Sequence, residues 1–68
     1  MFIVMRKEEI ATWFESELDI IECGALAGLD MYADSAPEWT LDIGVVAIDG
    51  GTPVAFAEAL AARGWEMV

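Results

Sequence analysis

The sequence contains no histidine and a single cysteine, Cys23. These absences exclude a Cys/His zinc site and an intrachain disulfide framework. A lone thiol fits a reducing cytosol, so we expect a cytoplasmic protein. No basic residue is near Cys23 in the sequence to lower its pKa, and we expect a small packing residue rather than a nucleophile. We expect no metal and no cofactor.

Basic residues are also scarce. Only Arg6, Lys7 and Arg63 stand against thirteen Asp and Glu residues, which gives a formal net charge of −10 at pH 7. A protein that holds nucleic acid or phosphate directly needs Lys and Arg, so we expect no direct nucleic-acid binding. The imbalance favours a basic partner, or simply solubility.

Long hydrophobic runs are missing as well. The longest uncharged run, residues 50–57, is far too short to span a membrane, and residues 1–9 become charged too early for a signal peptide. The apolar fraction is nevertheless 57%. This composition argues against disorder, and the length indicates one small domain over residues 1–68, for which we expect marginal stability.

The pattern along the chain predicts three strands and two or three helices. Residues 2–5, 39–48 and 65–68 have the composition or position of strands. A helix is expected from Arg6, ending near Gly24 or continuing to Ala33, and residues 34–37 predict a turn. A second helix is expected over residues 52–64, with Thr52 as N-cap and Gly64 just past its end. We therefore predict a small α/β (α+β) sandwich of β-α-β-α-β order.

An all-α bundle is the competing interpretation. "SAPE" (residues 35–38) has the spacing of a capping box, which would make residues 36–48 a helix. We favour the strand because Val45, Val46 and Ile48 are β-branched and Gly44 weakens a helix.

The first predicted helix has one apolar and one acidic side on a helical wheel. Its expected buried stripe consists of Ile10, Trp13, Phe14, Leu18, Ile21 and Ala25. The acidic strip on the opposite side is roughly 21 Å long. It consists of Glu8, Glu15, Asp19 and Glu22. Like charges three or four residues apart are destabilising, and no basic residue lies between Glu8 and Arg63 to offset them.

Two interpretations of this strip are open. The first is a solvated helix face that keeps a hydrophobic small protein soluble. The second is a row of carboxylates presented to the cationic side chains with which another protein holds a nucleic-acid backbone. Asp30 and Asp34 would extend such a contact surface.

In size, charge and lack of motifs, the chain resembles the small acidic inhibitors encoded by phages and other mobile elements, including anti-CRISPR proteins and DNA mimics. The residues behind the resemblance are the acidic strip together with Asp30, Asp34, Glu38 and Asp42. The resemblance implies a non-enzymatic blocker that binds a basic nucleic-acid-binding protein or a CRISPR surveillance complex. It covers composition along the whole chain and rests on no specific motif.

The alternative to an acidic inhibitor is a structural or assembly module, or an antitoxin-like partner. It would act through apolar surface near Trp39 or Trp65 as a monomer or weak homodimer.

An enzyme is not expected. Glu15 and Asp19 are close enough in sequence to share a metal, but no His, Lys or Arg nearby would orient a substrate. "DGGTP" (residues 49–53) lacks the glycine spacing and Lys of a phosphate-binding loop and predicts a turn before a helix. Gly24 and Gly28 predict close packing or a helix break.

Overall fold

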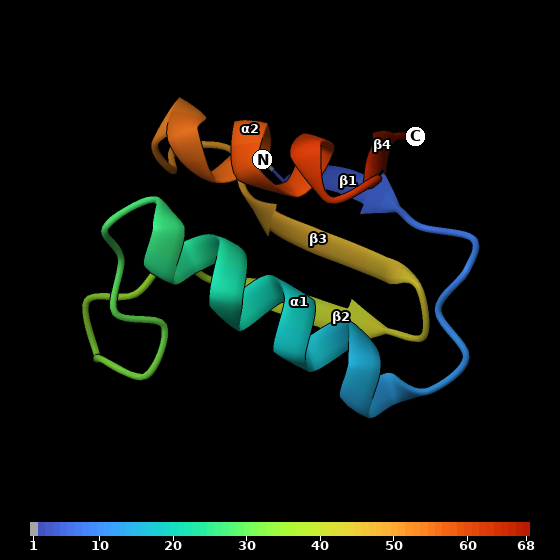
Figure 1. Ribbon diagram of the computed structural model, residues 1–68. Helices are drawn as coiled ribbons and strands as arrows, with labels where there is room; N and C mark the ends of the chain where they lie inside the picture. The colour runs from blue at the N-terminus through green and yellow to red at the C-terminus, as the bar shows by residue number, and fades with distance from the viewer. Residues whose placement is uncertain (1) are drawn as a thin grey trace.

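The computed structural model describes residues 2–68 and shows one antiparallel four-stranded sheet covered on one face by two helices (Figure 1). The strands are β1 (Phe2–Arg6), β2 (Trp39–Asp42), β3 (Val45–Asp49) and β4 (Glu66–Met67). The helices are α1 (Trp13–Leu26) and α2 (Val54–Ala62). The spatial strand order is β2-β3-β1-β4, so β1 lies in the sheet between β3 and β4. The predicted mixed α+β class is confirmed, and the all-α bundle is wrong.

The strand predicted over residues 39–48 is a hairpin, so the domain has four strands rather than three. The chain reverses at Ile43 and Gly44, and Asp42 pairs with Val45 across the turn. Gly44 has a φ of +68°, a conformation that residues with side chains rarely adopt. The β-branched composition identified strand correctly, but the single glycine divides the segment in two.

Helix α1 begins later than predicted, because residues 7–12 form a loop. Thr12 is the N-cap, and its Oγ1 accepts a hydrogen bond from the Glu15 N–H at 3.1 Å. The helix ends at Leu26, and Gly28 follows with a φ of +81°. A continuous helix from Arg6, or one that continues to Ala33, is therefore wrong, and the predicted break near the paired glycines is confirmed.

The buried side of α1 also differs from the predicted stripe. Ser16, Ile20, Cys23 and Gly24 are buried, whereas 61% of Phe14 is exposed. Trp13 and Leu18 are exposed too. Small residues line the buried side, and Gly24 lies directly against Met31, where a Cβ would collide with the methionine side chain. Ile10 and Ile21 of the predicted stripe are partly buried and pack against the core, so the prediction holds for them and is wrong for Trp13, Phe14 and Leu18.

The C-terminal part of the chain follows the prediction more closely. Helix α2 is preceded by Pro53, which occupies the N-cap position without a side-chain cap, so Thr52 is not the cap. Gly64 lies just past the helix with a φ of +95°. The predicted terminal strand is β4, which pairs antiparallel with β1. Trp65 is buried, so its predicted role as an exposed interface anchor is wrong.

The hydrophobic core lies between the helices and one face of the sheet. Both helices, strands β1 and β3, the loop after α1 and the residue before β4 contribute to it. Its buried members are Met5, Ile20, Cys23, Met31, Val46, Ile48, Phe56, Leu60 and Trp65. Neither helix covers the opposite face of the sheet (Figure 1).

Candidate protein-binding surfaces

The predicted acidic strip is not a single helix face. Glu8 lies in the loop between β1 and α1, whereas Glu15, Asp19 and Glu22 lie on α1. Asp30 and Asp34 lie in the loop between α1 and β2, beyond the C-terminal end of α1. The six predicted contact residues are therefore distributed over the helix and over the loops at its two ends.

Asp19 is held by three side chains from outside its own helix. Its Oδ2 accepts from Lys7 Nζ at 2.9 Å and from Trp65 Nε1 at 3.3 Å, and its Oδ1 lies 3.4 Å from Arg63 Nη1. Only 19% of the Asp19 side chain is exposed. Burial alone would raise the pKa of this carboxyl, but the hydrogen bond and charge of Lys7, the bond from Trp65 and the charge of Arg63 hold the pKa below its ordinary 3.8. Asp19 therefore joins the β1–α1 loop and the segment before β4 to α1.

The other two ion pairs also involve predicted contact residues. Arg63 Nη1 lies 2.9 Å from Glu22 Oε2, and Arg6 Nη2 lies 3.8 Å from Glu8 Oε1. The sequence places no basic residue between Glu8 and Arg63, but Lys7 and Arg63 reach α1 through the tertiary structure and offset part of the charge of the strip. Each of the three basic residues of the chain is paired with a carboxylate.

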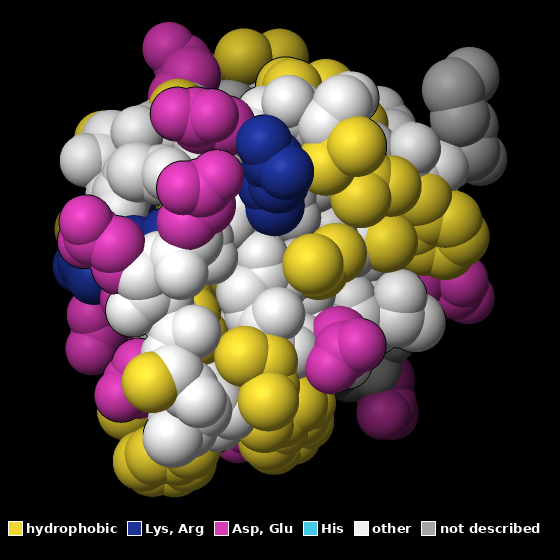
Figure 2. Space-filling view, turned by 90° about the vertical axis from the view of Figure 1, so that its right-hand side faces the viewer, with side chains coloured by type: hydrophobic (Ala, Val, Ile, Leu, Met, Phe, Trp, Pro, Cys, Tyr) yellow, Lys and Arg dark blue, Asp and Glu magenta, His cyan; other side chains and the backbone are white. Residues whose placement is uncertain are grey.

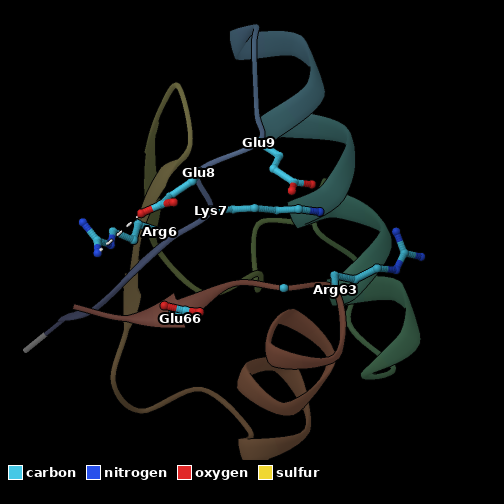
Figure 3. Close-up of a pocket in the computed structure, with 7 residues that line it drawn as sticks. Arg6, Lys7, Glu8, Glu9, Arg63 and Glu66 are labelled. Atoms are coloured by element: carbon cyan, nitrogen blue, oxygen red, sulfur yellow. Dashed lines mark ion pairs between the residues drawn. The ribbon is translucent and has the colours of Figure 1, made fainter.

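These basic residues line one surface hollow of about 390 Å³. Figure 3 shows Lys7 and Arg63 extending toward α1 and Arg6 pointing the other way, with its ion pair to Glu8. Glu9 and Glu66 also line the hollow. Its cations are paired and its lining includes several carboxylates, so it does not suit a phosphate or nucleic-acid ligand.

The remaining predicted contact residues are more accessible. Glu15 is exposed and accepts the Ala11 N–H at 3.0 Å, and Asp30 accepts the Tyr32 N–H at 3.0 Å. Asp34 is exposed and forms no ion pair within residues 2–68. Figure 2 shows acidic side chains on several parts of the visible surface, most densely along its left edge. The three exposed carboxylates are available to an external cation.

An aromatic groove lies between α1, the loop that follows it and the edge strand β2. It has a volume of about 330 Å³. Its lining consists of Trp13, Glu17, Ile21, Met31, Tyr32, Trp39 and Leu41. On α1, the contributing residues are spaced four apart and so lie along one side of the helix. On β2, the two contributing residues are two apart and point to the same face of the strand.

The sequence prediction missed this groove because it placed Trp13 in the core. The i, i+4 spacing of Trp13 and Glu17 was visible in the sequence. Their convergence with Tyr32 and Trp39 depends on the path of the loop over residues 27–38, which no local pattern indicated.

A second apolar surface is the uncovered face of the sheet. Phe2 and Val4 alternate along β1 with the less exposed Ile3 and Met5, and Val4 pairs with Ala47 of β3. Val45 of β3 is also exposed. Figure 2 shows hydrophobic side chains gathered on the right of the visible surface. The uncovered sheet face is a candidate contact surface for a second protein chain.

Two other features that the sequence singled out, Cys23 and the "DGGTP" segment, have structural roles. Cys23 is buried, and burial raises the pKa of its thiol, which does not favour a nucleophile. Asp49 accepts the Gly51 N–H at 3.0 Å, so "DGGTP" forms the predicted turn before α2. Within the same residues no three potential metal-ligating side chains converge, and neither helix has the length and apolar character needed to cross a membrane.

Comparison with family models, with curated proteins and with solved structures found no match for the chain. Three features of the surface therefore carry the information about function. They are the exposed carboxylates, the aromatic groove and the uncovered face of the sheet.

Proposed function

We propose that the protein is a non-enzymatic acidic inhibitor that binds the basic surface with which another protein holds nucleic acid, and so blocks that surface. The observation that supports this most directly is the distribution of charge. The three basic residues are paired with Glu8, Asp19 and Glu22, and the other carboxylates have no counterion within residues 2–68. Such a surface gains free energy by releasing counterions from a cationic groove.

Among the predicted contacts, we assign the leading role to Glu15, Asp30 and Asp34. Their carboxylates are exposed and accept at most backbone N–H groups within the part of the chain that the structure describes. Glu8 and Glu22 would contribute from the rim, since each already has an arginine partner. Asp19 would act by positioning Lys7 and Arg63.

The partner class is a nucleic-acid-binding protein or complex, of which a CRISPR surveillance complex is one example. The test is competition: each member of a panel of such complexes is incubated with labelled DNA or RNA and increasing protein, and displacement is measured at several salt concentrations. The proposal predicts stoichiometric displacement from at least one complex, weakening as salt rises.

A matched pair of variants separates a specific surface from bulk charge. Glu15→Lys combined with Asp34→Lys alters the proposed contacts. Glu58→Lys combined with Glu66→Lys changes the net charge of the protein by the same amount, but at positions on α2 and β4. We expect a loss of affinity of about tenfold or more for the first variant and a much smaller loss for the second. Equal losses would mean that bulk charge alone acts, and no loss in either would refute the proposal.

The uncovered sheet face supports a second candidate, an assembly module that acts as a weak homodimer. Phe2, Val4 and Val45 place exposed apolar side chains on this face. Sedimentation velocity at micromolar concentration would show a dimer with little salt dependence, and Val4→Lys would dissociate it. A monomer at all concentrations would exclude this candidate.

A further inference from the structure

We propose that the aromatic groove between α1 and β2 binds the cationic side chain of an arginine or lysine presented by a basic protein partner. This inference deepens the proposed function, on which it rests, by identifying a specific contact. The exposed carboxylates attract a basic surface at long range, whereas the groove would hold one of its side chains at short range.

Three aromatic rings line the groove. Trp13, Tyr32 and Trp39 come from α1, the loop after it and β2, and they line the same groove. Tyr32 is 80% exposed and Trp13 is 49% exposed, and both are much more accessible than the buried Trp65. The faces of such rings carry negative potential and attract ammonium and guanidinium groups.

The orientation of Trp13 is fixed by a hydrogen bond across the groove. Its Nε1–H donates to the Leu41 carbonyl at 3.4 Å. This bond provides a partner for the polar edge of the indole, so a ligand does not have to provide one. It also ties the wall on α1 to the wall on β2.

The groove also contains one carboxylate and no basic side chain. Glu17 lies in the lining one helical turn after Trp13 and is partly buried. No Lys or Arg lines the groove, and within residues 2–68 no ion pair engages Glu17. Asp19, which lies two residues after Glu17, is by contrast paired with Lys7 and Arg63. The groove therefore has a carboxylate that an incoming cation can neutralise.

The apolar part of the groove suits the aliphatic portion of such a side chain. Ile21, Met31 and Leu41 complete the lining beside the rings. Arginine and lysine cover apolar surface with their methylene groups while the charged end contacts polar groups. A purely apolar side chain would cover the same surface but leave Glu17 without a counterion.

The test uses three small probes that differ in charge: N-acetyl-arginine amide, N-acetyl-lysine amide and N-acetyl-citrulline amide. Citrulline has nearly the shape of arginine but is neutral. Each is titrated into isotopically labelled protein while the indole N–H resonances are followed by NMR. We expect at least one cationic probe to shift the Trp13 and Trp39 resonances in a saturable way. Trp65, which is buried and bonded to Asp19, serves as an internal reference.

Two variants test the assignment within the groove. Glu17→Gln removes the charge, and Tyr32→Ala removes one ring at a highly exposed position. Each should weaken binding of the cationic probe by about fivefold. Phe14→Ala and Glu58→Gln, exposed positions outside the groove lining, are the matched controls and should leave the affinity unchanged.

Equal shifts with arginine and citrulline amides would overturn the proposal, because they would show an uncharged apolar site. If neither the arginine amide nor the lysine amide produced saturable shifts, the proposal would also be overturned. If salt-dependent binding to a nucleic-acid-binding complex persisted in that case, the proposed function would stand without the groove. If the cationic probes bound the groove while no complex was inhibited, the proposed function would fail and the groove would be a cation site in its own right.

Discussion

The carboxylate of Asp19 accepts a hydrogen bond from the ammonium of Lys7 at 2.9 Å, although the two residues are twelve positions apart in the sequence. The pairing joins the loop after β1 to the middle of α1. Arg63 and Trp65 reach the same carboxylate from the other end of the chain. One acidic residue of the predicted strip thus connects three segments of the chain. Its contacts within the fold indicate a structural role rather than direct contact with a partner.

Replacing Asp19 should therefore destabilise the protein. Asp19→Asn removes the charge that faces Lys7 and Arg63 while keeping the size of the side chain. We expect a loss of about 1–3 kcal/mol in the free energy of unfolding, measured by urea denaturation. Glu58→Gln on α2, a residue that forms no ion pair within residues 2–68, is the control and should change stability by less than about 0.5 kcal/mol. Equal effects would argue against a structural role for Asp19.

The contribution of Asp19 should also depend on pH. Its pKa in the folded protein lies below the ordinary value of 3.8, so the ionised carboxyl stabilises the fold fully above about pH 3.8. This stabilisation is lost as the pH falls from there through the lower folded-state pKa. The difference in unfolding free energy between the native protein and Asp19→Asn should be constant from about pH 7 to about pH 5 and shrink toward about pH 3. A difference that grew on acidification would contradict the assignment.

The turn between β2 and β3 should not tolerate a side chain at Gly44. Its N–H donates to the buried Ser16 Oγ at 2.8 Å, and its carbonyl accepts the Lys7 N–H at 2.8 Å. A Cβ there would lie 2.6 Å from the Lys7 carbonyl oxygen, in addition to the strain of a positive φ. Gly28 also has a positive φ, but no atom lies within 4 Å of the position that its Cβ would take, so a substitution there isolates the strain.

We expect Gly28→Ala to cost about 1–2 kcal/mol and Gly44→Ala at least about 1 kcal/mol more, measured by thermal or urea unfolding. The extra cost reflects the collision with Lys7 and the disturbed bond to Ser16. Similar losses for the two variants would show that the hairpin turn can move away from the β1–α1 loop.

The buried side of α1 can be tested by two truncations. Ile20 is fully buried, so Ile20→Ala should cost about 2–5 kcal/mol. Phe14→Ala should cost less than about 1 kcal/mol, despite the greater size of the side chain, because Phe14 is largely exposed. The measurement is the free energy of unfolding of each variant. A larger loss at Phe14 would favour the apolar stripe predicted from the helical wheel.

The class of fold and several element ends could be predicted from local sequence signals. β-branched runs indicated strands, and Gly64 marked the end of α2. The hairpin was not predicted because only two residues, Ile43 and Gly44, separate β2 from β3. The composition of the whole segment is that of a single strand. The most deeply buried residues of α1 were not predicted because Ser16, Cys23 and Gly24 are small, and only the close approach of the hairpin and Met31 makes small residues favourable there.

The sequence by itself determined the net charge, the scarcity of cations and the mixed α+β class, because these follow from composition and local propensity. Only the tertiary structure decided which carboxylates are neutralised, since Lys7 and Arg63 are distant from Asp19 along the chain and meet it only when both ends pack against α1. It likewise decided that Trp13, Tyr32 and Trp39 line one groove with Glu17. Long-range contacts between segments depend on how the whole chain packs, and no local pattern contains that information.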